Sequence, residues 1–359
     1  MDWHFILINA LKIVVVIFGA VLPMVAYAVL VERKVCAAIQ DRVGPNRAAP
    51  FFVNYLPIVG PFLVRLGIFQ PLADGLKMLL KEDFTPAHVR KAYFWLAPAI
   101  AMVPAFLTIA VIPFGSNLGS ERMVIADLNV GVLYTFGIVS LSVYGIVLAG
   151  YASNSKYPFL GGIRSSAQMI SYEIAMGLSV IPVFILIGDL NLSEVVLAQS
   201  GGFSNWMICH TPMTFLSFCI FLVASFAETN RLPFDLPESE TELVGGYNTE
   251  YSSMKFGLFF MGEYAAMISV SALMVTLFCG GWTLPLFGLD QPATSLWEGV
   301  AHLAIFVVKM LSFMVLMIWV RWMLPRFRYD QLMQLGWRTL IPLALANIVV
   351  TAAWLWMKS

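Results

Sequence analysis

Near its start the chain reads Phe5-Ile-Leu-Ile-Asn-Ala-Leu-Lys-Ile-Val-Val-Val-Ile-Phe-Gly-Ala-Val-Leu-Pro-Met-Val-Ala-Tyr-Ala-Val-Leu-Val31, 27 residues with one charged side chain, Lys12. An α-helix needs about 20 mainly apolar residues to cross the hydrocarbon core of a bilayer. The run therefore predicts a transmembrane helix. It lacks the short apolar core and the small-residue cleavage site of a signal peptide, so we expect it to be retained.

The composition of the whole chain agrees with this first run. Of its 359 residues, 60% are hydrophobic and only 12% are charged, whereas soluble domains have about 25% charged residues. This excludes a soluble enzyme, a nucleic-acid-binding domain and a disordered protein. The 21 basic residues balance the 21 acidic ones, so no net field attracts nucleic acid.

Further runs of the same kind follow along the chain. The predicted spans are Phe5–Val31, Tyr93–Phe114, Val130–Tyr151, Ala167–Ile187, Trp206–Ala227, Ser253–Cys279, Ala301–Met323 and Arg338–Met357. The fifth is the weakest, because Pro212 shortens its start. With no linker or clear repeat, the sequence predicts an all-α integral membrane protein of about eight transmembrane helices, forming a single domain over 1–359.

The positions of Lys and Arg orient these spans. The loops that follow spans one, three, five and seven hold nine, two, two and four basic residues when Lys255, Arg321 and Arg338 at the adjoining span ends are included, and the other side holds only Arg122 and Lys358. Cytoplasmic loops carry such an excess. We therefore expect both termini on the periplasmic side and the loops 32–92 and 228–252 in the cytoplasm.

The first of these loops contains a short amphipathic segment, at about 67–81. Apolar residues recur at helical spacing: Ile68, Phe69, Leu72, Leu76, Leu79 and Leu80. A helix of this length is too short to span, so it fits the plane of the membrane interface. An ordinary cytoplasmic helix that covers the bundle is the alternative.

The four cysteines form no C-x-x-C pair, and the chain has no Gly-rich phosphate loop. The sequence therefore predicts neither a metal or iron–sulfur site nor a cofactor held by this chain.

Besides Lys12, three charged residues lie well inside predicted spans, away from their ends. Glu173 lies in the fourth, Glu263 in the sixth and Lys309 in the seventh. A charge at the centre of a transmembrane helix costs about 2.5–3.5 kcal/mol on insertion scales, so each is a candidate functional residue. Alternatively, either glutamate pairs with Lys309 as a neutral clamp between helices. The roles of Lys12 and Lys309 stay open.

The loop after the fifth span is acidic. It contains Glu228, Asp235, Glu238, Glu240, Glu242 and Glu250 against Arg231 alone. Such runs are usually solvated, but Pro233, Pro237 and alternating apolar residues favour a buried, acid-lined funnel leading to Glu228. The basic residues Arg33, Lys34, Arg42 and Arg47 are either membrane anchors or counter-charges for this loop.

Several segments between residues 20 and 325 resemble one family in the same order. They are Glu32-Arg33-Lys34, Asp41-Arg42-Val43-Gly44-Pro45-Asn46-Arg47, Gln70-Pro71-Leu72-Ala73-Asp74-Gly75-Leu76-Lys77, Ser171-Tyr172-Glu173, Ala227-Glu228-Thr229-Asn230-Arg231, Pro233-Phe234-Asp235-Leu236, Glu250-Tyr251 and Glu263-Tyr264. The chain thereby resembles the H subunit of bacterial NADH-quinone oxidoreductase, respiratory complex I, whose mitochondrial counterpart is NADH dehydrogenase subunit 1.

The resemblance implies a function within a larger enzyme. The chain would form the membrane part of the quinone chamber in the bacterial inner membrane. Its partners would be the quinone-reducing and iron–sulfur subunits of the hydrophilic arm, small membrane subunits, antiporter-like subunits and membrane lipid. Quinone, expected to be ubiquinone although menaquinone stays open, would be the substrate of the complex.

The same resemblance assigns residues by position. The residues implied for the proton path are Tyr172, Glu173, Glu228, Asp235 and Glu263. The residues implied for the quinone chamber and its rim are Arg33, Arg42, Asp74, Glu238, Glu240 and Glu242. We expect a protonation change to pass from Glu228 to Glu263 to Glu173.

Three other functions compete with this one. A membrane subunit of a related membrane-bound hydrogenase or formate hydrogenlyase would share many motifs. A stand-alone secondary transporter could use the same acids, although its usual inverted repeats are not found. A passive anchor for the hydrophilic arm would have no use for charges within the membrane.

Overall fold

The structure is a computed structural model that describes residues 3–50, 59–119, 121–236, 243–286 and 288–358. Seven helical segments in these ranges are long and apolar enough to cross a membrane: Leu7–Ile39, Lys91–Ile109, Gly131–Ala152, Lys156–Ile187, Ser253–Phe278, Leu296–Met323 and Tyr329–Lys358. An eighth apolar helix, Pro212–Glu228, is shorter. The prediction of an all-α membrane protein with about eight spans is confirmed.

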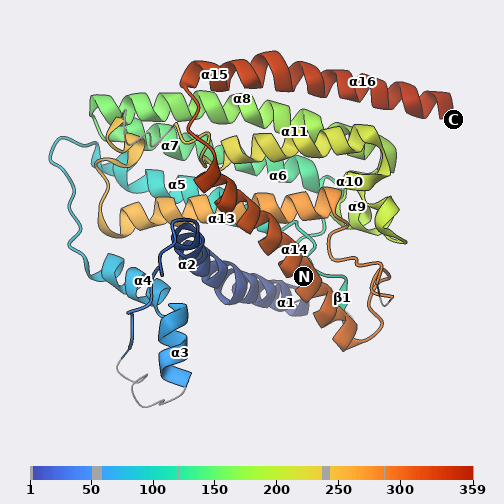
Figure 1. Cartoon of the computed structure of the whole chain (residues 1–359), viewed down its shortest axis with the longest axis horizontal. Helices are drawn as coiled ribbons and strands as arrows, with labels where there is room; N and C mark the ends of the chain where they lie inside the picture. The colour runs from blue at the N-terminus through green and yellow to red at the C-terminus, as the bar shows by residue number, and fades with distance from the viewer. Residues whose placement is uncertain (1–2, 51–58, 120, 237–242, 287, 359) are drawn as a thin grey trace.

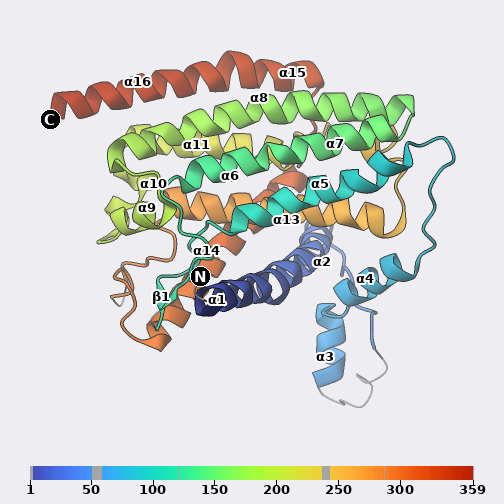
Figure 2. The ribbon, with the colours of Figure 1, turned by 180° about the vertical axis from the view of Figure 1, so that it is seen from behind.

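Helix α13 (Ser253–Phe278) is the centre of the bundle. Nineteen of its 26 residues are buried. Figures 1 and 2 show it running beside α5 (Lys91–Ile109), α11 (Pro212–Glu228) and the pair α6 and α7 (Gly131–Val139, Leu141–Ala152). Small residues bring these helices close, since a Cβ on Gly145 of α7 would lie 2.4 Å from the backbone of Ala101 in α5.

The first and last parts of the chain flank this centre on opposite sides (Figure 1). On one side lie α14 (Leu296–Met323) and a continuous helix made of α1 (Trp3–Val14), the π-helix η1 (Val15–Val21) and α2 (Leu22–Ile39). On the other side α8 (Lys156–Ile187) is covered by α15 (Tyr329–Gln334), the π-helix η5 (Leu335–Leu340) and α16 (Ile341–Lys358).

Two spans differ from their predicted bounds. α8 begins at Lys156 rather than Ala167, because its small early residues pack against protein: Gly161 approaches Gly246 of the turn η4 (Gly246–Asn248). The third span is interrupted at Ser140, whose hydroxyl donates to the carbonyl of Gly137 at 3.0 Å, and such bonds bend helices.

The fifth span is the shortest, as its proline indicated. Thr211 caps α11 by accepting from the backbone of Thr214, and Pro212 occupies the first turn. At 1.5 Å per residue, 17 residues reach about 26 Å. The short helices α9 (Leu192–Ala198), η3 (Phe203–Asn205) and α10 (Met207–His210) lie at the start of this helix.

Both termini lie at one end of the bundle (Figures 1 and 2), as expected for an even number of crossings. This end also carries a small hairpin of β1 (Asn117–Leu118) and β2 (Glu121–Arg122). The opposite end carries α3 (Val59–Leu66) and α4 (Gln70–Leu80). α4 confirms a helix within 67–81, and its Leu72, Leu79 and Leu80 are exposed. Its position in the interface plane stays a prediction.

Candidate functional site

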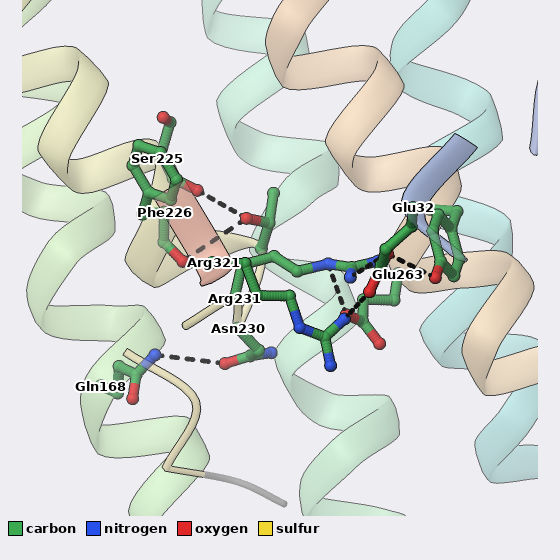
Figure 3. A network of polar contacts seen from close by, with 10 residues as sticks. Glu32, Gln168, Ser225, Phe226, Asn230, Arg231, Glu263 and Arg321 are labelled. Atoms are coloured by element: carbon green, nitrogen blue, oxygen red, sulfur yellow. Dashed lines mark hydrogen bonds and ion pairs between the residues drawn. The ribbon is translucent and has the colours of Figure 1, made fainter. Parts of the chain in front are cut away.

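Four charged side chains from distant segments meet near the α3–α4 end of the bundle (Figure 3). Arg231 follows α11 and is only 3% exposed. Its Nη1 lies 2.8 Å from Glu32 Oε2 of α2, and its Nε lies 2.8 Å from Glu263 Oε1 of α13. Arg321 of α14 pairs with the other oxygen of Glu32. We call Glu32, Arg231, Glu263 and Arg321 the central charge cluster.

Tyr264 completes this cluster. Its hydroxyl donates to Glu32 Oε2 at 2.7 Å, and the guanidinium of Arg231 lies 4.3 Å from the centre of its ring. Two acids and two arginines balance, so the cluster is neutral as a whole. Buried charges require such pairing, because removal of one partner leaves an uncompensated charge away from water.

The end of α11 directs Arg231 into the bundle. Thr229 Oγ1 donates to the carbonyl of Ser225 at 2.9 Å, Asn230 adopts the left-handed conformation with φ 51°, and the N–H of Arg231 donates to the carbonyl of Phe226 at 3.1 Å. A helix end of this kind turns the chain back on itself. Burial alone would lower the pKa of Arg231, but the charges of Glu263 and Glu32 outweigh it and raise that pKa. Arg231 therefore stays cationic.

Gln168 of α8 holds the turn that contains Arg231 through hydrogen bonds (Figure 3). Its Nε2 donates to the carbonyls of Ala227 and Phe234, both at 2.8 Å, and more weakly to Asn230 Oδ1 at 3.3 Å. Gln168 is fully buried. It therefore fixes the backbone on both sides of Arg231 to α8.

Asp235 lies at the edge of the cluster. Its carboxylate accepts from Arg326 Nη2 at 3.0 Å, and the neighbouring Phe234 ring packs between Tyr172 and Phe327. Burial raises the pKa of Asp235, and the nearby Arg326 only partly opposes that rise. Asp235 is thus easier to protonate than a solvated aspartate.

Glu228 is the last residue of α11 and is 4% exposed. Within the described ranges, neither of its carboxylate oxygens has a hydrogen-bond partner. It lines a cavity of about 60 Å³ together with Glu263, Asn230, Tyr247 and Ser269. About 10–15 Å³ of such space holds one water molecule, so the cavity has room for a short water chain between the two acids.

The other two residues predicted for the proton path lie on α8. Glu173 is half-buried and close enough to Glu228 for its charge to act on that carboxyl. Tyr172 is fully buried, but its hydroxyl donates to the backbone carbonyl of Leu332 at 2.9 Å. The structure thus places Glu173 near Glu228, whereas the hydroxyl of Tyr172 points towards α15.

The residues predicted for the quinone chamber are partly brought together. Arg33 Nη1 lies 2.6 Å from Asp74 Oδ2, and both line a cavity of about 230 Å³ with Lys77, Met78 and Phe256. Arg42 lies apart and contacts Cys36 Sγ at 3.5 Å. The three loop acids Glu238, Glu240 and Glu242 lie outside the described residues.

The alternative interpretation, in which Lys309 pairs with an intramembrane glutamate, is wrong. Lys309 Nζ donates to the carbonyls of Cys279, Gly281 and Thr283 at 2.8, 3.0 and 2.6 Å, where it satisfies buried carbonyls just beyond the end of α13. Glu263 instead pairs with Arg231. Lys12 pairs with Glu121 at 2.9 Å, at the end of the bundle that carries the termini.

Sequence analysis missed Glu32, Arg321 and Arg326 as members of the site. Each lies at or just beyond the end of an apolar run, where a charge is normally an anchor. Arg326 contacts Asp235, whereas Arg33, one of the basic residues considered as counter-charges for the acidic loop, pairs with Asp74. Within the described ranges, no group of three or more His, Cys, Asp or Glu residues could hold a metal ion.

Comparisons with known proteins match nearly the whole chain. A sequence model of the family described as NADH dehydrogenase matches residues 11–352. An H subunit of NADH-quinone oxidoreductase from Geobacter sulfurreducens is 50% identical over 342 residues, 94% of each chain. An H subunit from Koribacter versatilis is 46% identical over 368 residues, covering 99% of this chain and 98% of that protein. The chain therefore belongs to the NADH dehydrogenase family and, within it, to the H subunits of NADH-quinone oxidoreductase.

Proposed function

We propose that this membrane subunit couples quinone reduction to proton translocation through the central charge cluster and the cavity that joins Glu263 to Glu228. The observation that carries the proposal is a pair of acids on one cavity: Glu263 is partly buried and held by Arg231, and Glu228 is buried and has no partner within the described ranges. Burying an unpaired acid is costly, which favours a role that needs the group to change protonation.

The chemistry of the substrate supplies the driving event. Reduction of a quinone to a quinol takes up two electrons and two protons, so the charge near its headgroup changes before protons arrive. We place the headgroup on the side of the Arg33–Asp74 pair, one residue along α2 from Glu32. A charge change there acts on Glu32 and therefore on Arg231, the arginine that Glu32 shares with Glu263.

The energies are large enough for coupling. Two unit charges 2.8 Å apart, as in Arg231 and Glu263, interact by about 6 kcal/mol at an effective dielectric near 20. Weakening this pair leaves Glu263 as an uncompensated acid that takes up a proton. The proton then has a route through the cavity to Glu228, whose carboxyl interacts electrostatically with Glu173.

This route changes the order expected from sequence. We infer that protons pass from Glu263 to Glu228 to Glu173, because Glu228 shares a cavity with Glu263 and its carboxyl is acted on by the charge of Glu173. The sequence identity of 46–50% to H subunits over nearly the full length of the chain favours this function over that of a hydrogenase membrane subunit or a stand-alone transporter.

The test is amide substitution in the assembled complex, reconstituted in vesicles. Glu228→Gln and Glu173→Gln should each lower both quinone reduction and the number of protons translocated per NADH oxidised. NADH oxidation by an artificial acceptor should stay unchanged, which shows that the complex has assembled. Glu194→Gln is the matched control, because Glu194 is an exposed acid on α9. Wild-type pumping and quinone reduction in both variants would refute the proposal.

A further inference from the structure

A second, larger cavity lies away from the central charge cluster. Its volume is about 370 Å³, and it lies between the first helix (α1, η1 and α2) and α14, with α13 as its floor. The wall is apolar and includes Val16, Ala20 and Met24 on one side and Phe306 and Met310 on the other. Near the β1–β2 hairpin the lining also includes three charged residues, Lys12, Glu121 and Arg122.

The helix that forms one wall is irregular along the cavity. Residues Val15–Val21 form the π-helix η1, and four of the lining residues come from this segment. π-helical segments are rare and are frequently found at functional sites. Leu11 and Val15 are 59% and 57% exposed, so the cavity opens towards the lipid-facing surface of this helix.

The dimensions fit one lipid tail. From Lys12 to Met24 the helix rises about 18 Å at 1.5 Å per residue, close to the depth of one leaflet in a hydrocarbon core of about 30 Å. An apolar cavity of about 150 Å³ holds benzene, so 370 Å³ holds an acyl chain of roughly twice as many carbons. A transmembrane helix, about 10 Å wide, is too large.

The end near the hairpin carries both signs of charge. Lys12 Nζ pairs with Glu121 at 2.9 Å, and Arg122, whose side chain is 66% exposed, pairs with Asp127 at 2.6 Å. A phosphate would be attracted by Lys12 and Arg122, and an ammonium group by Glu121. A headgroup with one charge of each sign therefore suits this end better than an anionic headgroup or an uncharged quinone ring.

We infer that this cavity binds a zwitterionic phospholipid, with one acyl chain between the first helix and α14 and the headgroup at Lys12, Glu121 and Arg122. The lipid would fill the space beside the π-helix and hold α14 against the first helix. The inference rests on the cavity and its charged end, and it does not depend on the proposed proton path.

The test is photolabelling of the assembled complex in vesicles. The probe is phosphatidylethanolamine with a diazirine in the middle of one acyl chain, and labelled residues are mapped by mass spectrometry. We expect labelling of Val16, Phe306 or Met310 at least fivefold above that of the exposed helix α16. Ala20→Phe, which fills the cavity from an exposed position, should remove this excess. The control Ala346→Phe places the same ring on an exposed position of α16 and should leave it unchanged.

The headgroup has its own test. A phosphatidylglycerol probe should label the cavity at least threefold less than the phosphatidylethanolamine probe, and Glu121→Gln should reduce that difference. Equal labelling of the cavity and α16 would overturn the inference, as would labelling unaffected by Ala20→Phe. Stronger labelling by a diazirine-bearing ubiquinone analogue would identify a quinone site instead and would also overturn it.

Discussion

Replacing Arg231 by Gln removes a cation that contacts both Glu32 and Glu263. The central charge cluster then holds two acids and one arginine, Arg321, so its net charge changes from zero to −1. Breaking a buried ion pair by removing one partner costs about 3–5 kcal/mol. The contact with the Tyr264 ring, which is 4.3 Å from the guanidinium, is lost as well.

This loss of stability corresponds to a decrease in the melting temperature. At about 2.1 cal/mol/K per residue, the 359 residues give an unfolding entropy of about 0.75 kcal/mol/K. A loss of about 3–5 kcal/mol therefore lowers the melting temperature by about 4–7 °C. The assay heats the purified complex and follows the fraction of this subunit that still elutes with its partners on size-exclusion chromatography.

Two further variants make the measurement decisive. Adding Glu263→Gln to Arg231→Gln restores the charge balance and should recover at least half of the lost stability. Arg328→Gln is the matched control: Arg328 pairs with Asp330 at 2.8 Å, but both side chains are more than half exposed, so the cost is at most about 1 kcal/mol. If Arg231→Gln melts like Arg328→Gln, or if the double variant melts lower than the single one, the structural role of this cluster is refuted.

Three further predictions test other parts of the structure. Arg33→Ala and Asp74→Asn break a 2.6 Å pair beside a cavity, and each should lower quinone reduction while NADH oxidation by an artificial acceptor stays intact; a joint loss would indicate failed assembly. Lys309→Met leaves three carbonyls without their donor and should lower the melting temperature at an unchanged proton-to-NADH ratio, whereas an altered ratio would contradict its structural role. Gln168→Leu removes the hydrogen bonds that hold the turn around Arg231. It should lower the proton-to-NADH ratio more than Gln168→Asn, which keeps an amide. Equal pumping by the two variants would argue against a role of Gln168 in holding this turn.

The number of spans could be predicted from the sequence because bilayer thickness fixes the length of each apolar run. The bounds were less predictable, since they depend on contacts within the protein. α8 begins 11 residues before Ala167 because its early glycines pack against α7 and η4. Pro158, the two glycines and the basic residues Lys156 and Arg164 interrupt the apolar run there, so the sequence pattern gives no sign of the helix.

Some acids of the site could be found from sequence, but Glu32 and the pairing of the acids with their cations could not. Glu173 and Glu263 were recognised because a charge inside an apolar run is costly. Arg231 lies 199 residues from Glu32, and Arg321 lies 289 residues from it. Which ends of which helices meet depends on how the bundle packs, and no local pattern records that arrangement.

The central claim is that buried carboxyl groups of this subunit change protonation when quinone is reduced. Redox-difference infrared spectroscopy of the reconstituted complex measures this directly through the carbonyl stretch of protonated carboxyl groups. We predict a band of this kind on quinone reduction in the wild type, its loss in Glu228→Gln and its retention in Glu194→Gln. A difference spectrum of Glu228→Gln that is identical to the wild type would contradict the account.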